Sequence, residues 1–399
     1  MSFIVFLFVR IHTNLTMKKI QMVDLQSQYA KIQEQVDSKI SEVLKSAAYI
    51  NGPEVHSFQK NLETYLDVKH VIPCANGTDA LQIAMMGLGL EPGDEVITAD
   101  FTFAATVEVI ALLHLTPVLV DVEKDTFNMD IAALKKAITS KTKAIVPVHL
   151  FGQCANMEAV LEVAKEHNLF VIEDTAQAIG ANYTFKDGTK KKAGTIGTIG
   201  TTSFFPSKNL GCYGDGGAIF TDDDDLAHTI RGIVNHGMYK RYYHDVVGVN
   251  SRLDSVQAAV LNVKLPLLDG YCDARRKAAI FYNNAFKNNA NIVTPKTGNS
   301  CEFICENCDC HVFHQYTLQI LNGKRNELHQ HLLDNGIPNA IYYPVPLHSQ
   351  KAYADERYNE ADFKVTNELI DTVISLPMHT ELDEEQLNFI SSTILNFVK

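Results

Sequence analysis

Apolar residues return at helical spacing in an early stretch of the chain, residues 26–45. They recur every three or four positions, which places them on one face of an amphipathic helix. The members of this face are Tyr29, Ile32, Val36, Ile40, Val43 and Leu44. Asn51-Gly52-Pro53 interrupts the pattern, because glycine and proline end helices. The sequence therefore predicts an N-terminal helix and, after residue 53, a second one.

Short apolar runs alternate with helical stretches in the part of the chain that follows. Strands that alternate with helices form parallel sheets in which each helix crosses over between two strands. The runs occupy residues 71–73, 95–98, 117–120, 144–148 and 169–172. Residues 201–205 and 217–221 look like two more strands of the same sheet, on either side of a glycine-rich turn. We expect an α/β fold whose sheet is mostly parallel and flanked by helices.

The rest of the chain has the pattern of a smaller α/β domain. Helical spacing dominates residues 224–286, residues 312–320 alternate like a strand, residues 325–335 are helical, and two further helical stretches close the chain. We place a large domain at residues 17–270 and a small domain at residues 271–399. Residues 1–16 are interpreted as a non-native start extension, because Met17-Lys18-Lys19 directly precedes the first globular segment.

Composition excludes some classes of partner. The 399 residues are 46% hydrophobic and carry a formal net charge of −12, which disfavours binding to the phosphate backbone of nucleic acids. The apolar run from Ser2 to Val9 is too short for a membrane span and lacks the preceding basic residues of an export signal. We therefore expect a cytoplasmic protein that binds neither nucleic acid nor membrane.

The eight cysteines point to a reducing compartment. Cys74, Cys154, Cys212 and Cys272 lie in apolar or glycine-rich surroundings, where a free thiol commonly serves as a small buried apolar group. The other four crowd into the run from Cys301 to Cys310. With His311 and His314 this run allows a metal knuckle, but the paired CxxC spacing of zinc sites is missing. We predict a variable surface loop and no metal.

Two carboxylates end the apolar strand at residues 169–172. Glu173 and Asp174 follow it directly, at the carboxyl edge where α/β proteins build ligand sites. A carboxylate in this place can keep a pyridine nitrogen protonated, as the chemistry of pyridoxal phosphate (PLP) requires. The alternative is a helix cap, since aspartate at a strand-to-helix junction binds free backbone amides.

Lys208 lies in a loop of aromatic, hydroxyl and glycine residues. Such a lysine is poorly hydrated; desolvation lowers the pKa of its amine, and a neutral amine can attack an aldehyde to form a Schiff base. The alternative is a solvated surface lysine. The glycines on the C-terminal side of Lys208 favour a close backbone approach to a ligand instead.

A phosphate site is predicted where residues 75–80 leave a strand and open a helix. Backbone amides at a helix N-terminus attract anions, and Thr78 and Ser203 add hydroxyl groups. Phe103 is placed to stack on an aromatic cofactor. Taken singly, Thr78 is also explained as a helix cap, and an aromatic residue at a helix start, such as Phe103, is more often part of the core. Together with Lys208 and the two carboxylates, these residues predict an enzyme that uses pyridoxal 5'-phosphate.

The chain resembles the DegT/DnrJ/EryC1/StrS family of sugar-nucleotide aminotransferases, within the fold-type I PLP enzymes, from about Gln21 to near the C-terminus. The resemblance rests on six motifs. They are Cys74-Ala-Asn-Gly-Thr-Asp-Ala-Leu81, Glu173-Asp-Thr-Ala-Gln177, Ser203-Phe-Phe-Pro-Ser-Lys208, Gly214-Asp-Gly-Gly217, Asn235-His-Gly237 and Asn250-Ser-Arg-Leu-Asp254.

This resemblance implies a role for each matching residue. Lys208 would hold the cofactor and act as acid and base, Asp174 would bind its ring nitrogen, and Gln177 would lie beside its ring hydroxyl. Phe103 would stack on the ring. The phosphate would be bound by Gly77, Thr78, Ser203 and Asn250, the last from the neighbouring subunit of a homodimer with shared active sites.

Within the family, the amino-acid sequence of residues 204–221 and 247–252 is similar to that of the 3-aminotransferases that act on UDP-2-acetamido-2-deoxy-3-oxo-glucuronate. These enzymes use L-glutamate as amino donor and serve O-antigen and related polysaccharide pathways. Arg252 and Tyr342 would border the sugar, and an arginine fork suits a uronate carboxylate. Two departures are Tyr342-Tyr343-Pro344, where relatives tend to have His-Tyr-Pro, and the apparent insertion around Cys301–Cys310.

Two other functions stay open on the sequence. One is an aminotransferase for a dTDP-linked 3-keto or 4-keto deoxysugar, which needs no carboxylate-binding arginine. Another is a PLP-binding regulatory protein without turnover. Sugar dehydratases of the same family replace the lysine by histidine, so Lys208 argues against that activity. A dehydrogenase interpretation of the glycine-rich residues 194–200 is disfavoured, because GxGxxG is missing.

Overall fold

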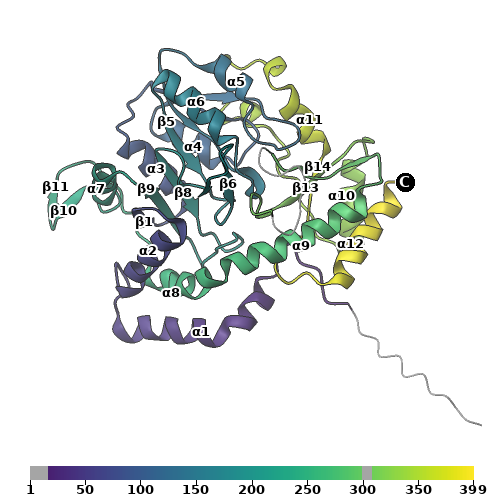
Figure 1. Cartoon of the computed structure of the whole chain (residues 1–399), viewed down its shortest axis with the longest axis horizontal. Coiled ribbons are helices and arrows are strands. Elements are labelled where there is room, and N and C mark those ends of the chain that lie inside the picture. Colours follow the sequence, from purple (N-terminus) through teal and green to yellow (C-terminus); the bar gives the residue numbers. More distant parts are fainter. Residues whose placement is uncertain (1–16, 299–307) are drawn as a thin grey trace, which may run out of the picture.

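The computed structural model describes residues 17–298 and 308–399, which form a large and a small α/β unit around two separate sheets. Figure 1 shows the large sheet with its helices on one side of the molecule and the small unit on the other. The proposed start extension at residues 1–16, and Cys301 and Cys305 of the cysteine-rich run, lie outside the described residues.

Seven strands form the large sheet, in the order β1-β9-β8-β5-β4-β2-β3. Their bounds are β1 (His70–Cys74), β2 (Glu95–Ala99), β3 (Thr116–Val120), β4 (Thr142–Val146), β5 (Phe170–Asp174), β8 (Ile199–Ser203) and β9 (Gly217–Thr221). The strands from β3 to β8 pair in parallel. β9 runs antiparallel to both β8 and β1. This mostly parallel sheet agrees with the prediction.

The antiparallel β9 follows from its connection. No helix crosses over between β8 and β9; the chain returns through the loop that holds Lys208, and a return without crossover makes neighbouring strands antiparallel. Helices cover both faces of the sheet. They are α2 (Pro53–Leu66), α3 (Gly77–Gly87), α4 (Ala105–Leu112), α5 (Ile131–Ala137), α6 (Met157–His167), α7 (Asp224–Ile233) and α8 (Ser255–Lys264).

Each face of the sheet has its own core. Side chains of α3, α4 and α7 pack on one face, around Ala84, Ile110 and Ile230. Side chains of α2, α6 and α8 pack on the other, around Phe58 and Val160. The predicted N-terminal helix is α1 (Leu25–Ser46), whose apolar stripe lies against α8.

The small unit is an antiparallel sheet in the order β12-β13-β14, with helices packed around it. It contains α9 (Leu268–Phe286), β12 (Ile292–Val293), β13 (Tyr316–Ile320), α10 (Arg325–Asp334), α11 (Lys364–Thr372), β14 (Val373–Leu376) and α12 (Glu384–Phe397). The predicted strand at 312–320 is shorter than expected, and β14 between the last two helices was not predicted. The proposed domain boundary at residue 270 falls inside α9 and stays a prediction.

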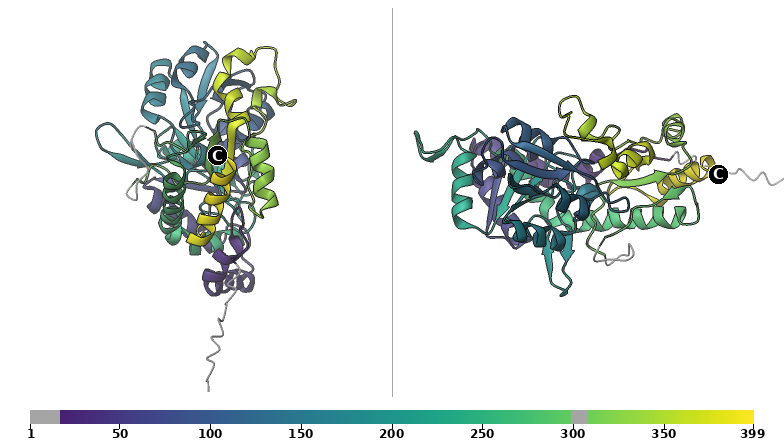
Figure 2. Two further views of the ribbon diagram at one scale, coloured as in Figure 1. Left: turned by 90° about the vertical axis from the view of Figure 1, so that its right-hand side faces the viewer. Right: turned by 90° about the horizontal axis from the view of Figure 1, so that it is seen from above.

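Two hairpins project from the body of the large unit. One joins β6 (Asn182–Thr184) to β7 (Lys190–Lys192); the other joins β10 (Met238–Lys240) to β11 (Tyr243–His244), inside a stretch predicted as helical. Figures 1 and 2 show the β10–β11 hairpin reaching away from the core next to α7. Within residues 17–298 and 308–399, no helix combines the length and the apolar character needed to cross a membrane.

Candidate active site

A cavity of about 730 Å³ opens at the carboxyl ends of β5 and β8, beside the N-terminus of α3. It contains most of the residues singled out from the sequence. The predicted residues that line it are Gly77, Thr78, Phe103, Asp174, Gln177, Ser203, Lys208 and Tyr342. Asn250 and Arg252 do not line this cavity. Segments far apart in the chain thus meet at one edge of the sheet.

Asp174 ends β5 and is only 5% exposed. Its Oδ2 accepts a hydrogen bond from Thr106 Oγ1 at 2.9 Å, and its Oδ1 accepts one from the backbone N–H of Ala176 at 3.1 Å. Turns rather than a helix follow at residues 176–180, so the interpretation of Asp174 as a helix cap is wrong. The carboxylate keeps further lone pairs for a group in the cavity.

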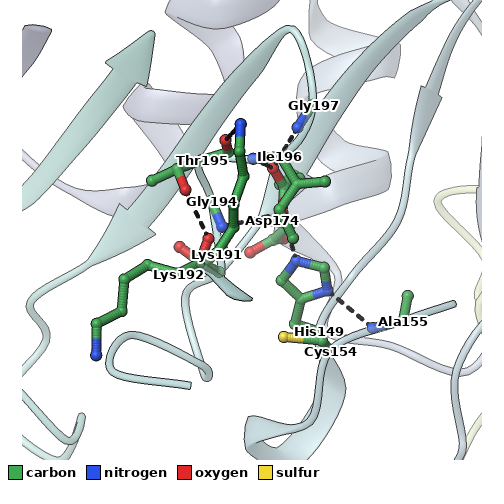
Figure 3. Close-up of polar contacts among 12 residues, drawn as sticks. His149, Cys154, Ala155, Asp174, Lys191, Lys192, Gly194, Thr195, Ile196 and Gly197 are labelled. Atoms are coloured by element: carbon green, nitrogen blue, oxygen red, sulfur yellow. Dashed lines mark hydrogen bonds and ion pairs between the residues drawn. The ribbon is translucent and has the colours of Figure 1, made fainter. Parts of the chain in front are cut away.

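Glu173 serves a different purpose from Asp174, although the two are neighbours. Its fully buried carboxylate accepts hydrogen bonds from the backbone N–H groups of Gly194, Ile196 and Gly197, at 2.6 to 2.9 Å, and contacts His149 Nε2 at 2.9 Å. Figure 3 labels the partners in this network, His149, Gly194, Ile196 and Gly197, together with Asp174. The glycines that resembled a dinucleotide loop therefore hold a structural carboxylate.

Lys208 is half-buried in the loop between β8 and β9. Burial lowers the pKa of its amine to about 8, although the negative charge of Asp174 acts in the opposite direction. The loop is tight: a Cβ atom on Gly211 would lie 2.3 Å from the carbonyl oxygen of Pro206. Glycine is therefore required three residues after the lysine. Because Lys208 is half-buried and lines the cavity, the solvated-surface alternative is wrong.

The N-terminus of α3 forms a cradle suited to an anion. Asn76 caps the helix by accepting a hydrogen bond from Asp79 N at 2.8 Å, and Gly77 and Thr78 line the cavity. A Cβ atom on Gly77 would lie 2.7 Å from Cβ of Ser203, so only glycine permits this approach. Free amides and a positive helix end favour a phosphate here.

Gln177 is oriented by two partners. Its Oε1 accepts a hydrogen bond from Phe151 N at 2.7 Å, and its Nε2 donates to Tyr343 Oη at 3.2 Å. Tyr343 was not predicted as a site residue; its ring lies 6.4 Å from that of Phe103, centre to centre. Phe103 is 58% exposed and lines the cavity, so it is not a core residue.

His314 is a second cavity residue that sequence reasoning did not place in this site, since it was considered only as a metal ligand. Burial and the neighbouring Lys208 hold its pKa well below the ordinary value, so the ring is neutral. Its Nδ1 has no hydrogen-bond partner within residues 17–298 and 308–399. The described cysteines, histidines and carboxylates include no cluster able to hold a metal; the absence of a metal stays a prediction.

Asn250 and Arg252 lie in the segment that follows the β10–β11 hairpin. Asn250 is exposed and forms a β-bridge with Asn235, whose side-chain oxygen accepts a hydrogen bond from Arg252 Nη1 at 3.5 Å. No arginine of the described residues lines the cavity. Among residues 17–298 and 308–399 of one chain, a carboxylate in the cavity therefore finds no arginine in the cavity wall.

The residues of the cavity fit PLP. The cradle at the N-terminus of α3 suits the phosphate of PLP, and the Asp174 carboxylate suits its ring nitrogen. Phe103 can stack on the face of the ring, and the Lys208 amine can react with the aldehyde. These features come from four separate segments, which the fold brings to one place.

Comparisons with known proteins agree with this geometry. The chain is 45% identical to the UDP-2-acetamido-2-deoxy-3-oxo-D-glucuronate aminotransferase of Pseudomonas aeruginosa, over 94% of this chain and 100% of that protein. It is 44% identical to a pleiotropic regulatory protein of Geobacillus stearothermophilus, over 95% of this chain and 99% of that one.

Solved structures share the fold. A crystal structure of S. venezuelae DesV in complex with a ketimine intermediate superposes with a TM-score of 0.89, at 35% identity, over 96% of this chain and 99% of that one. The model of the DegT/DnrJ/EryC1/StrS aminotransferase family matches residues 30–395. The chain belongs to the DegT/DnrJ/EryC1/StrS aminotransferase family.

Proposed function

We propose that the protein transfers the amino group of L-glutamate to C3 of a nucleotide-linked keto sugar, namely UDP-2-acetamido-2-deoxy-3-oxo-D-glucuronate, with PLP as cofactor. One observation carries the proposal: a lysine amine with a pKa of about 8 shares a cavity with the Asp174 carboxylate and a helix N-terminus. The similarity to the Pseudomonas aeruginosa enzyme supports the choice of sugar.

When bound, PLP supplies an aldehyde that condenses with amines and a protonated ring that withdraws electrons from the reacting carbon. Lys208 would hold the cofactor through its amine and, when that amine is free, would move a proton. With a pKa of about 8, about a tenth of free Lys208 amines carry no proton at pH 7. The amine can therefore both accept and donate a proton near neutral pH.

The other residues bind and orient. The Asp174 carboxylate, held by Thr106 and Ala176, keeps a proton on the ring nitrogen. Gly77, Thr78 and Ser203 hold the phosphate, and Gln177 lies beside the ring hydroxyl. The overall reaction is balanced: L-glutamate and the keto sugar become 2-oxoglutarate and the amino sugar.

A homodimer with shared active sites completes the proposal. In this proposal Asn250 reaches the phosphate, and Arg252 the uronate carboxylate, of the partner's site. The observation that neither residue lines the cavity of its own chain supports this arrangement. Tyr342 borders the sugar. The product serves the synthesis of O-antigen or a related polysaccharide. We place the enzyme in the cytoplasm, because Cys74, Cys154, Cys212 and Cys272 are buried free thiols that need no oxidising compartment.

The test follows the absorption spectrum of the PLP-loaded protein. L-glutamate alone is expected to convert the cofactor to its amino form with release of 2-oxoglutarate, and the UDP-linked 3-keto uronate to convert it back. A dTDP-linked neutral keto deoxysugar, added in parallel, should react at least 10-fold more slowly, because the bidentate arginine contact is lost. Faster reaction of the neutral sugar would favour the deoxysugar alternative.

A second candidate is a regulatory role without turnover, which the similarity to the Geobacillus stearothermophilus protein favours. Lys208 and Asp174 are both present in the cavity, as turnover requires. A spectrum that does not respond to L-glutamate or to either sugar would leave the regulatory role standing.

A further inference from the structure

A buried histidine joins two walls of the cavity at its mouth. One wall contains Thr102 and Phe103 and continues to the start of α4, while Asp100 lies behind it, directly after β2. The other wall consists of residues 344–350, of which Pro344, Val345, Leu347 and Gln350 line the cavity. Phe103 and Val345 are 58% and 40% exposed, which places both at the opening.

His348 connects these walls through Asp100. Asp100 is fully buried; its Oδ1 accepts a hydrogen bond from the backbone N–H of His348 at 2.7 Å, and its Oδ2 contacts His348 Nδ1 at 2.7 Å. Leu347 N also donates to the carbonyl oxygen of Asp100, at 3.3 Å. Three contacts between two residues of the wall and one aspartate fix the separation of the walls.

The second ring nitrogen of His348 faces another carboxylate. Nε2 lies 3.1 Å from Glu360 Oε2, on the short helix η4 (Glu360–Asp362). Both nitrogens therefore contact carboxylates, which accept but do not donate hydrogen bonds when ionised. A neutral imidazole has a single N–H, so satisfying both contacts requires the imidazolium form. The ring also stacks on Phe363, 4.3 Å between centres.

Electrostatics agree with this assignment. Burial by itself lowers the pKa of His348, but the hydrogen bonds to Asp100 and Glu360 outweigh it and raise the pKa above the ordinary value. Burial, with a smaller contribution from Asp121, raises the pKa of Asp100 above its ordinary value, and the hydrogen bonds from His348 act in the opposite direction. We therefore assign the proton to His348. Tyr358 is a further titratable neighbour of Asp100.

We propose that His348 is a positioning residue: an imidazolium clamped between Asp100 and Glu360 that holds the wall of residues 344–350 in place for the acceptor sugar. The proposal rests on the proposed function. A nucleotide-linked sugar is several times larger than L-glutamate and must contact the mouth of the cavity, whereas the small donor can react near Lys208 without it. The clamp therefore acts on the second half-reaction.

The pH dependence has a definite sign. The pKa of His348 is higher in the folded protein than the unfolded value of about 6.5, so the imidazole is protonated below that value and the clamp is complete there as long as Asp100 is ionised. It is lost as the pH rises through the higher, folded pKa. The KM for the sugar should accordingly rise with pH, while the reaction with L-glutamate does not follow this transition.

The experiment compares the holoenzyme with its His348→Asn variant, whose side-chain amide can still donate to Asp100 but cannot reach Glu360 as a cation. We expect the variant's KM for the UDP-linked keto sugar to rise about 10-fold at pH 7 and to lose its dependence on pH. The rate with L-glutamate should stay within about 2-fold. Asp362→Asn, on the same short helix but in a surface ion pair with Lys136, is the matched control.

Two results would overturn the proposal: equal losses in both half-reactions, which indicate a general structural defect, or an unchanged KM for the sugar. If His348→Asn does not fold, Glu360→Gln gives the same comparison at an exposed position. A readout independent of turnover is the NMR titration of the His348 imidazole. If the pKa of His348 is ordinary and is the same in Asp100→Asn, the clamp is refuted. This result does not depend on whether the wild-type protein is active on these substrates.

Discussion

At the scale of single residues, the amine of Lys208 dominates the chemistry. Only the neutral amine attacks an aldehyde, and burial lowers the pKa of Lys208 to about 8. We therefore expect the rate at which the apoprotein captures PLP to rise with pH and to level off above about pH 8. Stopped-flow absorbance of the forming complex measures this rate. A midpoint above pH 10, as for an ordinary lysine, would contradict the assignment.

Lys264 provides the control for this prediction. Burial lowers its pKa to about 8 as well, but its Nζ donates to the carbonyl oxygen of Gly211 at 2.7 Å, outside the cavity. After borohydride reduction, PLP should remain attached to wild-type protein and to Lys264→Met, but not to Lys208→Ala. Comparing the two variants shows whether PLP attaches to a lysine because its pKa is low or because it lies in the cavity.

At the scale of elements, the approach of α3 to β8 forms the phosphate cradle. In Gly77→Ala the added Cβ would lie 2.7 Å from Cβ of Ser203, so helix and strand must move apart. Overpacking of this kind costs about 1–3 kcal/mol, and we expect PLP affinity to fall by about 10-fold or more. Fluorescence titration of the apoprotein with PLP measures the change.

Gly270→Ala is the matched control, because beyond the backbone of α9 itself no atom of the described residues lies within 4 Å of a Cβ at this exposed position. It should leave PLP affinity unchanged and stabilise the helix by about 0.5–1 kcal/mol. If both alanine variants lost affinity equally, the effect would be unrelated to the cradle.

At the scale of the whole molecule, the proposed dimer predicts complementation. Lys208→Ala disables one chain's own cavity, whereas Arg252→Ala disables the contribution to the partner's cavity. A mixed dimer then contains one intact site. Random exchange of the two inactive variants should restore about a quarter of wild-type activity, since half of the dimers are mixed and each has one working site. Activity after joint refolding tests this.

No recovery of activity, although mass spectrometry detects mixed dimers, would mean that Arg252 serves its own chain. The geometry argues otherwise, because Arg252 contacts Asn235 and lies outside the lining of its own cavity. A second mixture, Lys208→Ala with Asp174→Asn, should show no recovery, since both residues line the same cavity.

The sequence by itself determined the elements and the chemistry that depends on local pattern. Helix and strand periods placed α1 and the strands of the large sheet within a few residues, because apolar periodicity is a local property. The lysine loop, the carboxylates after β5 and the start of α3 were recognisable for the same reason. The mostly parallel sheet followed from the alternation of strands and helices.

Only the tertiary structure decided which neighbours share a site. Asp174 faces the cavity while Glu173 binds the loop at residues 194–197, because successive residues of a strand point to opposite faces. Tyr343, His314 and the clamp of His348 on Asp100 join segments far apart in the chain, which no local pattern reveals. Whether a side chain enters a cavity depends on the packing of the whole fold, and this is a property that sequence spacing does not encode.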